Sequence, residues 1–534
     1  MAGRVIGISG PTVITDLGGL ALYDLVTVGR HGLQGEVVRL ERQGAVVQVY
    51  EETRGVRIGE AVTGLGRPLS VKLGPGLLGK IFDGLQRPLE AIRRESGPYI
   101  RPGALLPALE KDRVWRFEPE VEIGSRVRRH QRLGSFSEGA FRHHIHATAE
   151  GVVREISQEV AGFDQPLVVL DTGQRLKAFE DWSIRAPRPF VRKLSPDSPL
   201  VTGQRCIDFL FPIARGGSAI LPGGFGTGKT ILEQAIAKYA DIDLVVYVGC
   251  GERGNEMAEL LEEFSALTDP WNDRRLMERT IMVANTSNMP VAAREASIYT
   301  AVTMAEYYRD MGYHVLLLAD SISRWAEALR EISSALEEMP GEEGYPTYLA
   351  SRLAGFFARA GVVETASGGI GSLSMIISVS PPGGDFTEPV TQACLRACGT
   401  FLMLDAALAH RRHFPAINWQ QSFSLYEKKS TRFFQDSVSG EWPRLQGRCR
   451  VLLQEEEKLR EVAEIVGAEG LQEEDHLLME VAERIRTTFL SQNSYTEDAF
   501  STPAHTAGLI ETIVSDYDAT LEKLGSGPAN PVQP

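Results

Sequence analysis

Cysteine is scarce in this sequence, with five residues in 534 and no paired spacing. A chain held together by disulfides would use more of them, so the sparse, odd-numbered set predicts a reducing compartment. Cys394 and Cys398 lie one helical turn apart, but two thiols without further nearby ligands are more typical of packed side chains than of a metal site. The sequence therefore predicts neither a disulfide framework nor a zinc site.

Long apolar runs are absent as well. Nowhere do as many as about 18 apolar residues follow one another, which is the length that a membrane-spanning helix needs. The first residues, Met1 to Pro11, contain too short an apolar run for a signal peptide. Any role at a membrane is therefore expected to depend on partner proteins.

Positive charge is in deficit, because 56 Lys and Arg face 70 Asp and Glu and leave a net charge of −14. A protein that binds a phosphate backbone needs a basic face, so nucleic acid is not expected as a partner. With 43% hydrophobic and 24% charged residues the composition is that of a globular protein, and the length favours three to four domains.

One stretch, Ala219 to Thr230, organises the rest of the chain. An apolar, strand-like run leads into the pattern G-x-x-x-x-G-K-[ST], followed by a helical pattern in which Ile231, Leu232, Ala235 and Ile236 share a face. A glycine-rich turn that merely caps a helix is the alternative, but this strand–loop–helix context favours a phosphate-binding loop. The loop residues are Gly223, Gly224, Phe225, Gly226, Thr227, Gly228, Lys229 and Thr230. Lys229 is expected to reach the β- and γ-phosphates, and Thr230 to hold Mg²⁺.

The remaining chain divides by pattern into six parts. Short β-type runs separated by Gly and Pro predict an N-terminal β-barrel over 1–70, a linking segment over 71–103 and an inserted β-rich module over 104–186. Alternating apolar strands and helices predict an α/β nucleotide-binding domain with a mostly parallel sheet over 187–430. An apolar stripe of Leu478, Val481, Ile485 and Phe489 predicts an α-helical bundle over 431–524, and 525–534 is expected to be a flexible tail.

The inserted module contains His143, His144 and His146, of which the alternate positions share a face of a strand. No Cys or acidic residue with matching spacing accompanies them, so we interpret them as surface histidines rather than metal ligands. The spacing of its predicted strands resembles that of biotinyl or lipoyl carrier modules, but the module lacks a lysine at the expected hairpin tip. A swinging cofactor is therefore not expected.

Two carboxylates end predicted strands in the α/β domain. Asp320 follows the apolar run Val315–Ala319, an arrangement typical of the Walker B acid that helps to hold Mg²⁺. Glu252 follows the strand Asp243–Gly249, where it can either orient an attacking water or complement the dipole of the next helix. The residues alone leave these two interpretations of Glu252 open.

Five longer motifs carry a resemblance to a known family. They are GCGERGNE (249–256), NTSNMPVAAREASIYT (285–300), SRWAEALREI (323–332), PPGGDF (381–386) and RRHFP (411–415). The chain resembles the catalytic A subunit (alpha chain) of V/A-type rotary ATPases and ATP synthases over essentially its whole length, including the inserted module. The resemblance implies a RecA-like fold for the central domain.

The resemblance also implies roles for single residues. Glu252 matches the water-orienting glutamate and Arg253 a phosphate-side arginine, while Lys229, Thr230 and Asp320 match the phosphate and Mg²⁺ groups. Phe414 and Tyr495 match the aromatic positions beside adenine. The sequence departs from the family pattern at Gly224, where proline is common, and at Ile322, where threonine is usual. Thr227 stands where eukaryotic relatives carry a redox-sensitive cysteine, which implies that this control is absent.

The implied function is ATP synthesis or hydrolysis coupled to H⁺ or Na⁺ transport, with ATP or ADP and Mg²⁺ bound. The implied partners are a homologous non-catalytic B subunit that alternates with this chain in a hetero-hexamer and supplies an arginine finger, central stalk subunits and a membrane ion-translocating sector. The implied location is cytoplasmic, at the cytoplasmic face of a membrane. A hexameric ATPase of protein export is the alternative enzyme, but it lacks the inserted module. The acidic composition disfavours an RNA-translocating hexamer, and intact Lys229, Thr230 and Glu252 disfavour a purely structural role.

Overall fold

The computed structural model describes residues 2–97, 99–110, 112–466 and 471–525. The chain forms two compact units. The first contains Met1–Ser195, Ile242–Pro381 and Asp385–Ala397, and the second contains Pro196–Asp241, Pro382–Gly384 and the chain from Cys398 onward. Each unit therefore draws on segments that are far apart in the sequence.

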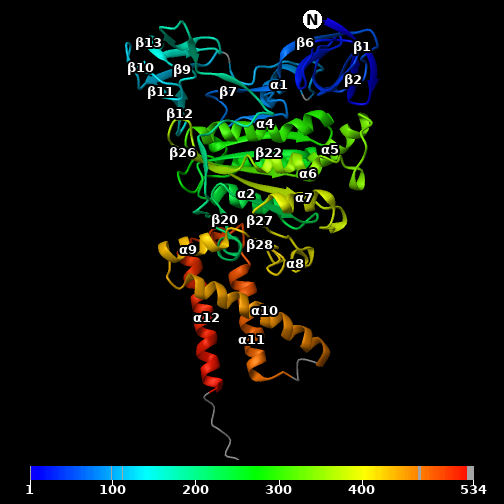
Figure 1. Ribbon diagram of the computed structural model, residues 1–534. Coiled ribbons are helices and arrows are strands. Elements are labelled where there is room, and N and C mark those ends of the chain that lie inside the picture. The colour runs from blue at the N-terminus through cyan, green and yellow to red at the C-terminus, as the bar shows by residue number, and fades with distance from the viewer. Residues whose placement is uncertain (1, 98, 111, 467–470, 526–534) are drawn as a thin grey trace, which may run out of the picture. The chain divides into compact units, whose positions relative to one another are not determined.

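A closed six-stranded antiparallel barrel begins the first unit, as the sequence predicts (Figure 1). Its strand order is β1-β2-β5-β4-β3-β6. The strands are β1 (Ala2–Ser9), β2 (Thr12–Thr15), β3 (Asp24–Val28), β4 (Leu33–Glu41), β5 (Gly44–Val49) and β6 (Ala61–Pro68). Val13, Val26, Val37, Val47 and Val62 fill the interior, because β-branched side chains suit the pleated wall of a small barrel.

The inserted module consists of two four-stranded sheets, in the orders β10-β13-β15-β16 and β12-β11-β9-β14. Its strands are β9 (Val114–Pro119), β10 (Arg126–Val127), β11 (Arg132–Glu138), β12 (Phe141–His146), β13 (Gly151–Ile156), β14 (Glu159–Ala161), β15 (Pro166–Leu170) and β16 (Arg175–Lys177). The rings of Trp115, Phe117 and Phe136 pack in its core, with the centroids of Phe117 and Phe136 5.3 Å apart. Strand β7 (Ser70–Leu73) leads toward the module, and β17 (Glu180–Ser183) returns antiparallel beside it.

A buried histidine anchors the module to the central part of the first unit. His143 Nδ1 lies 3.0 Å from Glu138 Oε2, and its Nε2 lies 2.8 Å from the hydroxyl of Tyr307. The other Glu138 oxygen accepts a hydrogen bond from the backbone N–H of Gly76. The interpretation of these histidines as surface residues is therefore wrong for His143, which is 1% exposed, because a partner 164 positions away satisfies its ring.

The central part of the first unit is a parallel sheet in the order β26-β24-β22-β23-β8, as predicted. Its strands are β8 (Ile81–Phe82), β22 (Leu244–Glu252), β23 (Thr280–Thr286), β24 (His314–Asp320) and β26 (Ile370–Val379), extended by antiparallel β25 (Gly361–Glu364) and β18 (Arg192–Leu194). The accompanying helices are α1 (Leu89–Ser96), α3 (Gly254–Ala266), η2 (Leu276–Arg279), α4 (Val291–Asp310), α5 (Ile322–Ala335), η3 (Glu342–Gly344), α6 (Leu349–Phe357) and α7 (Pro389–Ala397).

Helix α4 lies across this sheet and is buried on every side from residue 292 to 309. A helix buried all round belongs to a core, and its small residues let neighbouring strands and α5 approach closely. It nevertheless carries charge: Glu295 meets Arg185 at 2.6 Å, and Glu306 meets Arg359 at 2.5 Å. Buried charges need such partners, because an unpaired ion in the interior is costly.

The second unit begins with the antiparallel pair β19 (Pro199–Leu200) and β20 (Ile213–Ala214), between which lies η1 (Cys206–Leu210). Strand β21 (Ser218–Pro222) pairs in parallel with β27 (Thr400–Phe401), which pairs antiparallel with β28 (Phe423–Ser424). Helix α2 (Lys229–Tyr239) follows β21, and η4 (Pro382–Gly384) and α8 (Ala406–His410) complete this region.

A helical region ends the second unit, as predicted. It contains α9 (Glu427–Ser437), α10 (Trp442–Val466), α11 (Glu473–Arg484), η6 (Ile485–Leu490), η7 (Glu497–Ala499) and α12 (Pro503–Gly525). Trp442 stacks on Phe434 with 4.4 Å between ring centroids, and Val481, Ile485 and Phe489 of the expected stripe are buried while Leu478 is half-buried. Of the expected tail over 525–534, Gly525 ends α12 and 526–534 lie outside the described residues.

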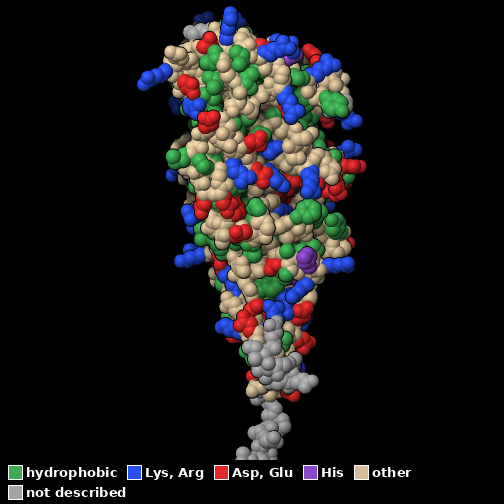
Figure 2. Space-filling view, turned by 90° about the vertical axis from the view of Figure 1, so that its right-hand side faces the viewer, with side chains coloured by type: hydrophobic (Ala, Val, Ile, Leu, Met, Phe, Trp, Pro, Cys, Tyr) green, Lys and Arg blue, Asp and Glu red, His purple; other side chains and the backbone are tan. Residues whose placement is uncertain are grey.

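Basic and acidic side chains are interspersed on the face seen in Figure 2. Ion pairs link neighbouring surface helices, for example Arg484 to Asp516 at 2.8 Å and Arg448 to Asp518 at 3.0 Å. All five cysteines are buried thiols, and burial raises the pKa of Cys250 and Cys449 to about 12. No described helix has the length and apolar character needed to cross a bilayer.

We expect His143→Ala to loosen the inserted module, because the change leaves Glu138 Oε2 and the Tyr307 hydroxyl without their imidazole partner and opens a cavity. Loss of such a buried network costs about 2–4 kcal/mol. Hydrogen exchange of the β11 and β12 amides should therefore accelerate, because exchange reports the free energy of local opening. The control is His476→Ala, at an exposed position on α11. Unchanged exchange in His143→Ala would contradict the anchoring role.

Candidate functional site

The loop between β21 and α2 has the backbone of an anion cradle. Gly226 and Gly228 have φ angles of 77° and 82°, in the left-handed region that favours glycine. A Cβ at Gly228 would also crowd the Phe414 ring, because it would lie 3.2 Å from that ring. The loop therefore needs its glycines, and it leads into a helix whose first N–H groups have no intrahelical acceptors.

Lys229 and Thr230 begin helix α2, and Thr227 stabilises the loop in front of them. The Lys229 ammonium donates to the Gly223 carbonyl at 2.7 Å, which holds it across the loop that it follows. Buried Thr227 donates through its hydroxyl to the Gly224 carbonyl at 2.9 Å. Phe225, in contrast, is 90% exposed at the tip of the loop.

The two aromatic residues expected beside adenine belong to the same unit as the loop. Phe414 packs against Gly228, and its carbonyl accepts a hydrogen bond from the backbone N–H of Gln492 at 2.6 Å. Tyr495 follows three residues after Gln492 and is 82% exposed. The segment that carries Tyr495 is thus tied to the segment that carries Phe414.

Arg205 holds this arrangement in place and was not singled out by the sequence. Its guanidinium donates to the carbonyls of Phe489 and Ser491 at 2.8 and 2.7 Å and pairs with Asp498. Its backbone N–H donates to the Gln492 side chain at 2.8 Å. No local motif marks such a residue, because the first of these partners already lies 284 positions away along the chain.

In the first unit, Glu252 and Asp320 lie at one edge of the parallel sheet. Glu252 is the last residue of β22, and Asp320 is the last of β24, paired in register with Gly249 of β22. Parallel strands end at the same edge of a sheet, which is where such folds place their functional groups. Glu252 is half-buried and Asp320 is 6% exposed.

The pKa of Glu252 is raised to about 8. Burial is the largest cause, and the negative charges of Asp320 and Glu256 add to it, while Arg324 opposes the rise. In the isolated chain, the carboxyl group of Glu252 therefore retains its proton near neutral pH. A strongly perturbed carboxyl at a strand end is typical of a functional site.

Two arginines that the sequence did not single out surround this acidic edge. A Cβ at Gly251, whose φ is 76°, would lie 2.7 Å from Arg324 Cβ and 3.0 Å from Arg294 Cδ, so only glycine allows their close approach. Arg324 is held by Glu327 through two hydrogen bonds of 3.0 and 2.9 Å. Arg294 Nε and the hydroxyl of Ser321, next to Asp320, are buried without a hydrogen-bond partner among the described residues. Such groups are rare in interiors and are usual where a polar ligand binds.

Arg253 has a different environment from its neighbour Glu252. It occupies the N-cap position of α3, its side chain is 66% exposed, and it pairs with Glu256 at 3.3 Å. The position places an exposed cation at the outer side of the acidic edge. This surface pair does not fix the guanidinium, because exposed pairs contribute little.

The structure thus groups the predicted site residues into two sets, one in each unit. The loop residues, Lys229, Thr230, Phe414 and Tyr495 belong to the second unit, and Glu252, Arg253 and Asp320 to the first. Among the described residues, no group of three or more His, Cys, Asp or Glu side chains is arranged to hold a metal. A Mg²⁺ site of the P-loop kind needs only a hydroxyl, one carboxylate, phosphate and water.

Family models match consecutive parts of the chain. They describe the beta-barrel domain (residues 5–66), the barrel-sandwich domain (106–185) and the nucleotide-binding domain (203–424) of the ATP synthase alpha/beta family, and the C-terminal domain of V and A type ATP synthase (431–527). The V-type ATP synthase alpha chain of Anaeromyxobacter sp. (strain K) is 50% identical over 99% of this chain and 92% of that relative. The corresponding A subunit of the A-type ATP synthase of Methanopyrus kandleri is 49% identical over 98% and 91%.

This chain belongs to the V/A-type ATP synthase alpha/A subunit family. It is a catalytic subunit of that ATP synthase, a multisubunit complex, so the resemblance drawn from the motifs is confirmed. The assembled ATPase EscN of an enteropathogenic E. coli type III secretion system has a TM-score of 0.70 over 96% of this chain and 100% of its own, at 22% identity. That likeness concerns the fold alone. The matched barrel-sandwich and C-terminal domains favour the V/A family over the protein-export alternative.

The raised pKa of Glu252 predicts a pH-dependent effect on stability. Below a pH of about 4.5 the carboxyl is protonated in both the folded and the unfolded chain and has no effect. As the pH rises toward 8, the unfolded chain ionises and the folded chain does not, so folding loses stability. Glu252→Gln removes this cost and should raise the melting temperature at pH 8 by about a few degrees, with no gain at pH 4.5. Glu259→Gln, on the exposed side of α3, is the control. An equal change in melting temperature at pH 4.5 and at pH 8 would contradict the raised pKa of Glu252.

Proposed function

We propose that this chain binds ATP through the loop of the second unit and that the acidic edge of the first unit supplies the carboxylates used in ATP synthesis or hydrolysis. The observation that carries the proposal is the register of β22 and β24, which brings Glu252 and Asp320 to a single edge. Membership of the ATP synthase family supports the substrate. The two sets of residues supply complementary groups, cations and N–H donors in one and carboxylates in the other.

Lys229 binds the β- and γ-phosphates in this proposal. Its ammonium already lies at the Gly223 carbonyl, which is a weak acceptor compared with a phosphate dianion, so it can exchange that partner for phosphate oxygen. The N–H groups in the first turn of α2, which lack intrahelical acceptors, add hydrogen bonds to the same oxygens. The open space around Gly224 and Gly226 leaves room for this approach.

Thr230 and Asp320 are the residues that fit Mg²⁺, as hydroxyl and carboxylate oxygens are the ligands it prefers. Bound with ATP, Mg²⁺ would supply positive charge against the charge that develops on the transferred phosphoryl group. The departures at Gly224 and Ile322 leave the Lys229, Thr230 and Asp320 side chains intact.

Glu252 orients the water that attacks the γ-phosphate, or that leaves in synthesis. A carboxylate accepts a hydrogen bond from water, whereas the protonated form donates one. Neutralising the charge of Asp320 removes one of the acids that raise the pKa of Glu252, and Arg324 lowers that pKa further. Such neutralisation favours the water-binding carboxylate form of Glu252, against the burial that is the largest cause of its raised pKa.

Phe414 and Tyr495 flank the adenine ring, and Arg253 lies on the phosphate side. Aromatic faces stack on a base regardless of its polar groups, and the exposure of Tyr495 leaves its ring available. The side chain of Arg253 is largely exposed, so its guanidinium is able to turn toward phosphate.

The chain functions in an alternating hetero-hexamer with a homologous non-catalytic B subunit that supplies an arginine finger. The transition state of phosphoryl transfer needs added positive charge at the γ-phosphate. The central stalk couples turnover to a membrane sector that moves H⁺ or Na⁺, with this chain held at the cytoplasmic face. Family membership supports this arrangement.

Two variants separate binding from chemistry. Lys229→Ala should abolish both nucleotide binding and turnover, because it removes the cation that the phosphates need. Glu252→Gln should leave affinity for ATP equal or higher and lower turnover by about two to three orders of magnitude, since the amide adds no repulsion but cannot act as a carboxylate. Fluorescent-nucleotide titration and steady-state ATPase assays of the assembled complex measure the two quantities. Parallel loss of affinity and turnover in Glu252→Gln would show that the residue is structural.

Isolated and assembled chains should differ in turnover. Without a partner arginine the chain should bind nucleotide and turn it over slowly, and assembly with the B subunit should raise the rate about 10³-fold, the lower end for an arginine finger. A steady-state assay with and without the added B subunit measures the difference. Full activity of the isolated chain would refute the sharing of the site between chains.

A further inference from the structure

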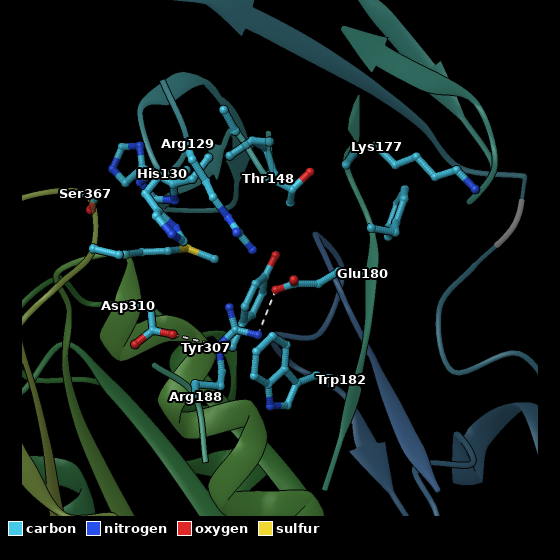
Figure 3. Close-up of a pocket in the computed structure, with 18 of the residues that line it drawn as sticks. Arg129, His130, Thr148, Lys177, Glu180, Trp182, Arg188, Tyr307, Asp310 and Ser367 are labelled. Carbon is cyan, nitrogen blue, oxygen red and sulfur yellow. Dashed lines mark hydrogen bonds and ion pairs between the residues drawn. The ribbon is translucent and has the colours of Figure 1, made fainter. Parts of the chain in front are cut away.

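A cavity of about 380 Å³ lies within the first unit, between the inserted module and the last turn of α4 (Figure 3). Arg129, His130 and Thr148 of the module line one side, and Tyr307 and Asp310 of α4 line the other. None of these residues belongs to the proposed nucleotide site. The volume is at the lower end of the range for small-molecule sites.

The floor of the cavity is electrically neutral because its two acids are already paired. Arg188 meets Glu180 at 2.8 Å and Asp310 at 2.6 Å, and its guanidinium lies between the rings of Trp182 and Tyr307, at 4.6 and 5.1 Å from their centroids. Asp310 accepts a second cation, Arg309, at 2.6 Å. The positive charge of Arg188 is thus balanced by these two acids, and the paired acids do not repel an anion that enters above them.

The walls, in contrast, include two arginines that pair with no acid in the described part of the chain. Among the described residues, neither Arg129 nor Arg175 forms an ion pair or a side-chain hydrogen bond. Lys177 points away from the cavity in Figure 3 and pairs with Asp164 at 2.7 Å. Two guanidinium groups, one from the turn that holds Arg129 and one from the start of β16, therefore remain available to one ligand.

Two neutral histidines add hydrogen-bonding groups to this wall. His144 and His146 are alternate residues of β12 and both line the cavity, as their spacing predicts. His144 Nδ1 is buried and has no hydrogen-bond partner within the described chain. The pKa of His146 is lowered to about 4, first by burial and then by His144, Arg132 and His130. Both rings are therefore neutral near pH 7, and each can donate one N–H to a ligand in the cavity.

We propose that this cavity binds a small phosphomonoester. Guanidinium forks and imidazole N–H groups match the oxygens of a phosphoryl group, and the Thr148 hydroxyl adds a donor. The apolar surfaces of Phe179, Trp182 and Met311 fit a short carbon skeleton beside it. The inserted module thereby has a ligand-binding role in addition to its structural one.

The test uses the full chain carrying Lys229→Ala, so that the phosphate loop does not compete for the probe. Calorimetric titration with glycerol 3-phosphate should show one site. Arg129→Ala/Arg175→Ala should weaken binding by about tenfold or more, since each charge-assisted hydrogen bond is worth at least that factor. Arg126→Ala/Arg128→Ala is the matched control, because it removes two exposed arginines of the same module that do not line the cavity. The affinity of this control variant for glycerol 3-phosphate should equal that of the Lys229→Ala chain.

A second variant, Thr148→Trp, tests the cavity without changing charge. The indole should fill the space and abolish binding while circular dichroism stays unchanged. Glycerol and succinate, offered as probes, distinguish a phosphoryl site from a polyol or a general anion site. Binding of succinate as tight as that of glycerol 3-phosphate, absence of binding by the parent chain, or equal affinity in the Arg129→Ala/Arg175→Ala variant would each overturn the proposal.

Discussion

The pairing of buried charge along helix α4 is the constraint on which the first unit depends. A helix enclosed on every side can carry charged residues only if each finds a partner. Glu295 forms an ion pair with Arg185, which also pairs with Glu36 of the barrel at 3.0 Å. Glu306 forms an ion pair with Arg359. Glu36 belongs to the barrel, Arg185 follows β17, the strand that returns from the module, and Arg359 lies just after α6. One helix therefore fixes the barrel, the module and the sheet relative to the strand ends that carry Glu252 and Asp320.

At the strand ends, in contrast, the acidic side chains are not each paired with an arginine of the described chain. Glu252 is half-buried there and other acids crowd it, so burial first and these charges second raise its pKa. Along α4 each acid meets an arginine, whereas Asp320 and Glu256 act on Glu252 with Arg324 as the moderating charge. A polar atom without a hydrogen-bond partner in the described chain, Arg294 Nε, occurs at the same edge. Such an unbalanced set of charges is what a site requires if added charge is to alter the protonation of one carboxyl group.

The inserted module also has both paired and unpaired polar groups where it meets α4. Its interface with α4 has a fully paired part, where His143 links Glu138 to Tyr307. It also has a cavity wall where Arg129 and Arg175 lack anionic partners among the residues that the structure describes. The first part explains why the module is held in place. The second is a surface on which a small anion would contact the end of α4, because that helix forms part of the cavity floor.

The sequence by itself determined the order of barrel, module, parallel sheet and helical region, because each has a periodicity that local residues set, and the loop at 223–230 needs only its own glycines. It also indicated Glu252 and Asp320, because a carboxylate after an apolar strand is a local pattern. Tertiary structure alone decided the burial of His143, the support that Arg205 gives to the segments of Phe414 and Tyr495, and the perturbed pKa of Glu252. Each of these depends on a partner brought close by folding, and the energy of a buried polar group is fixed by such neighbours rather than by its own residue type.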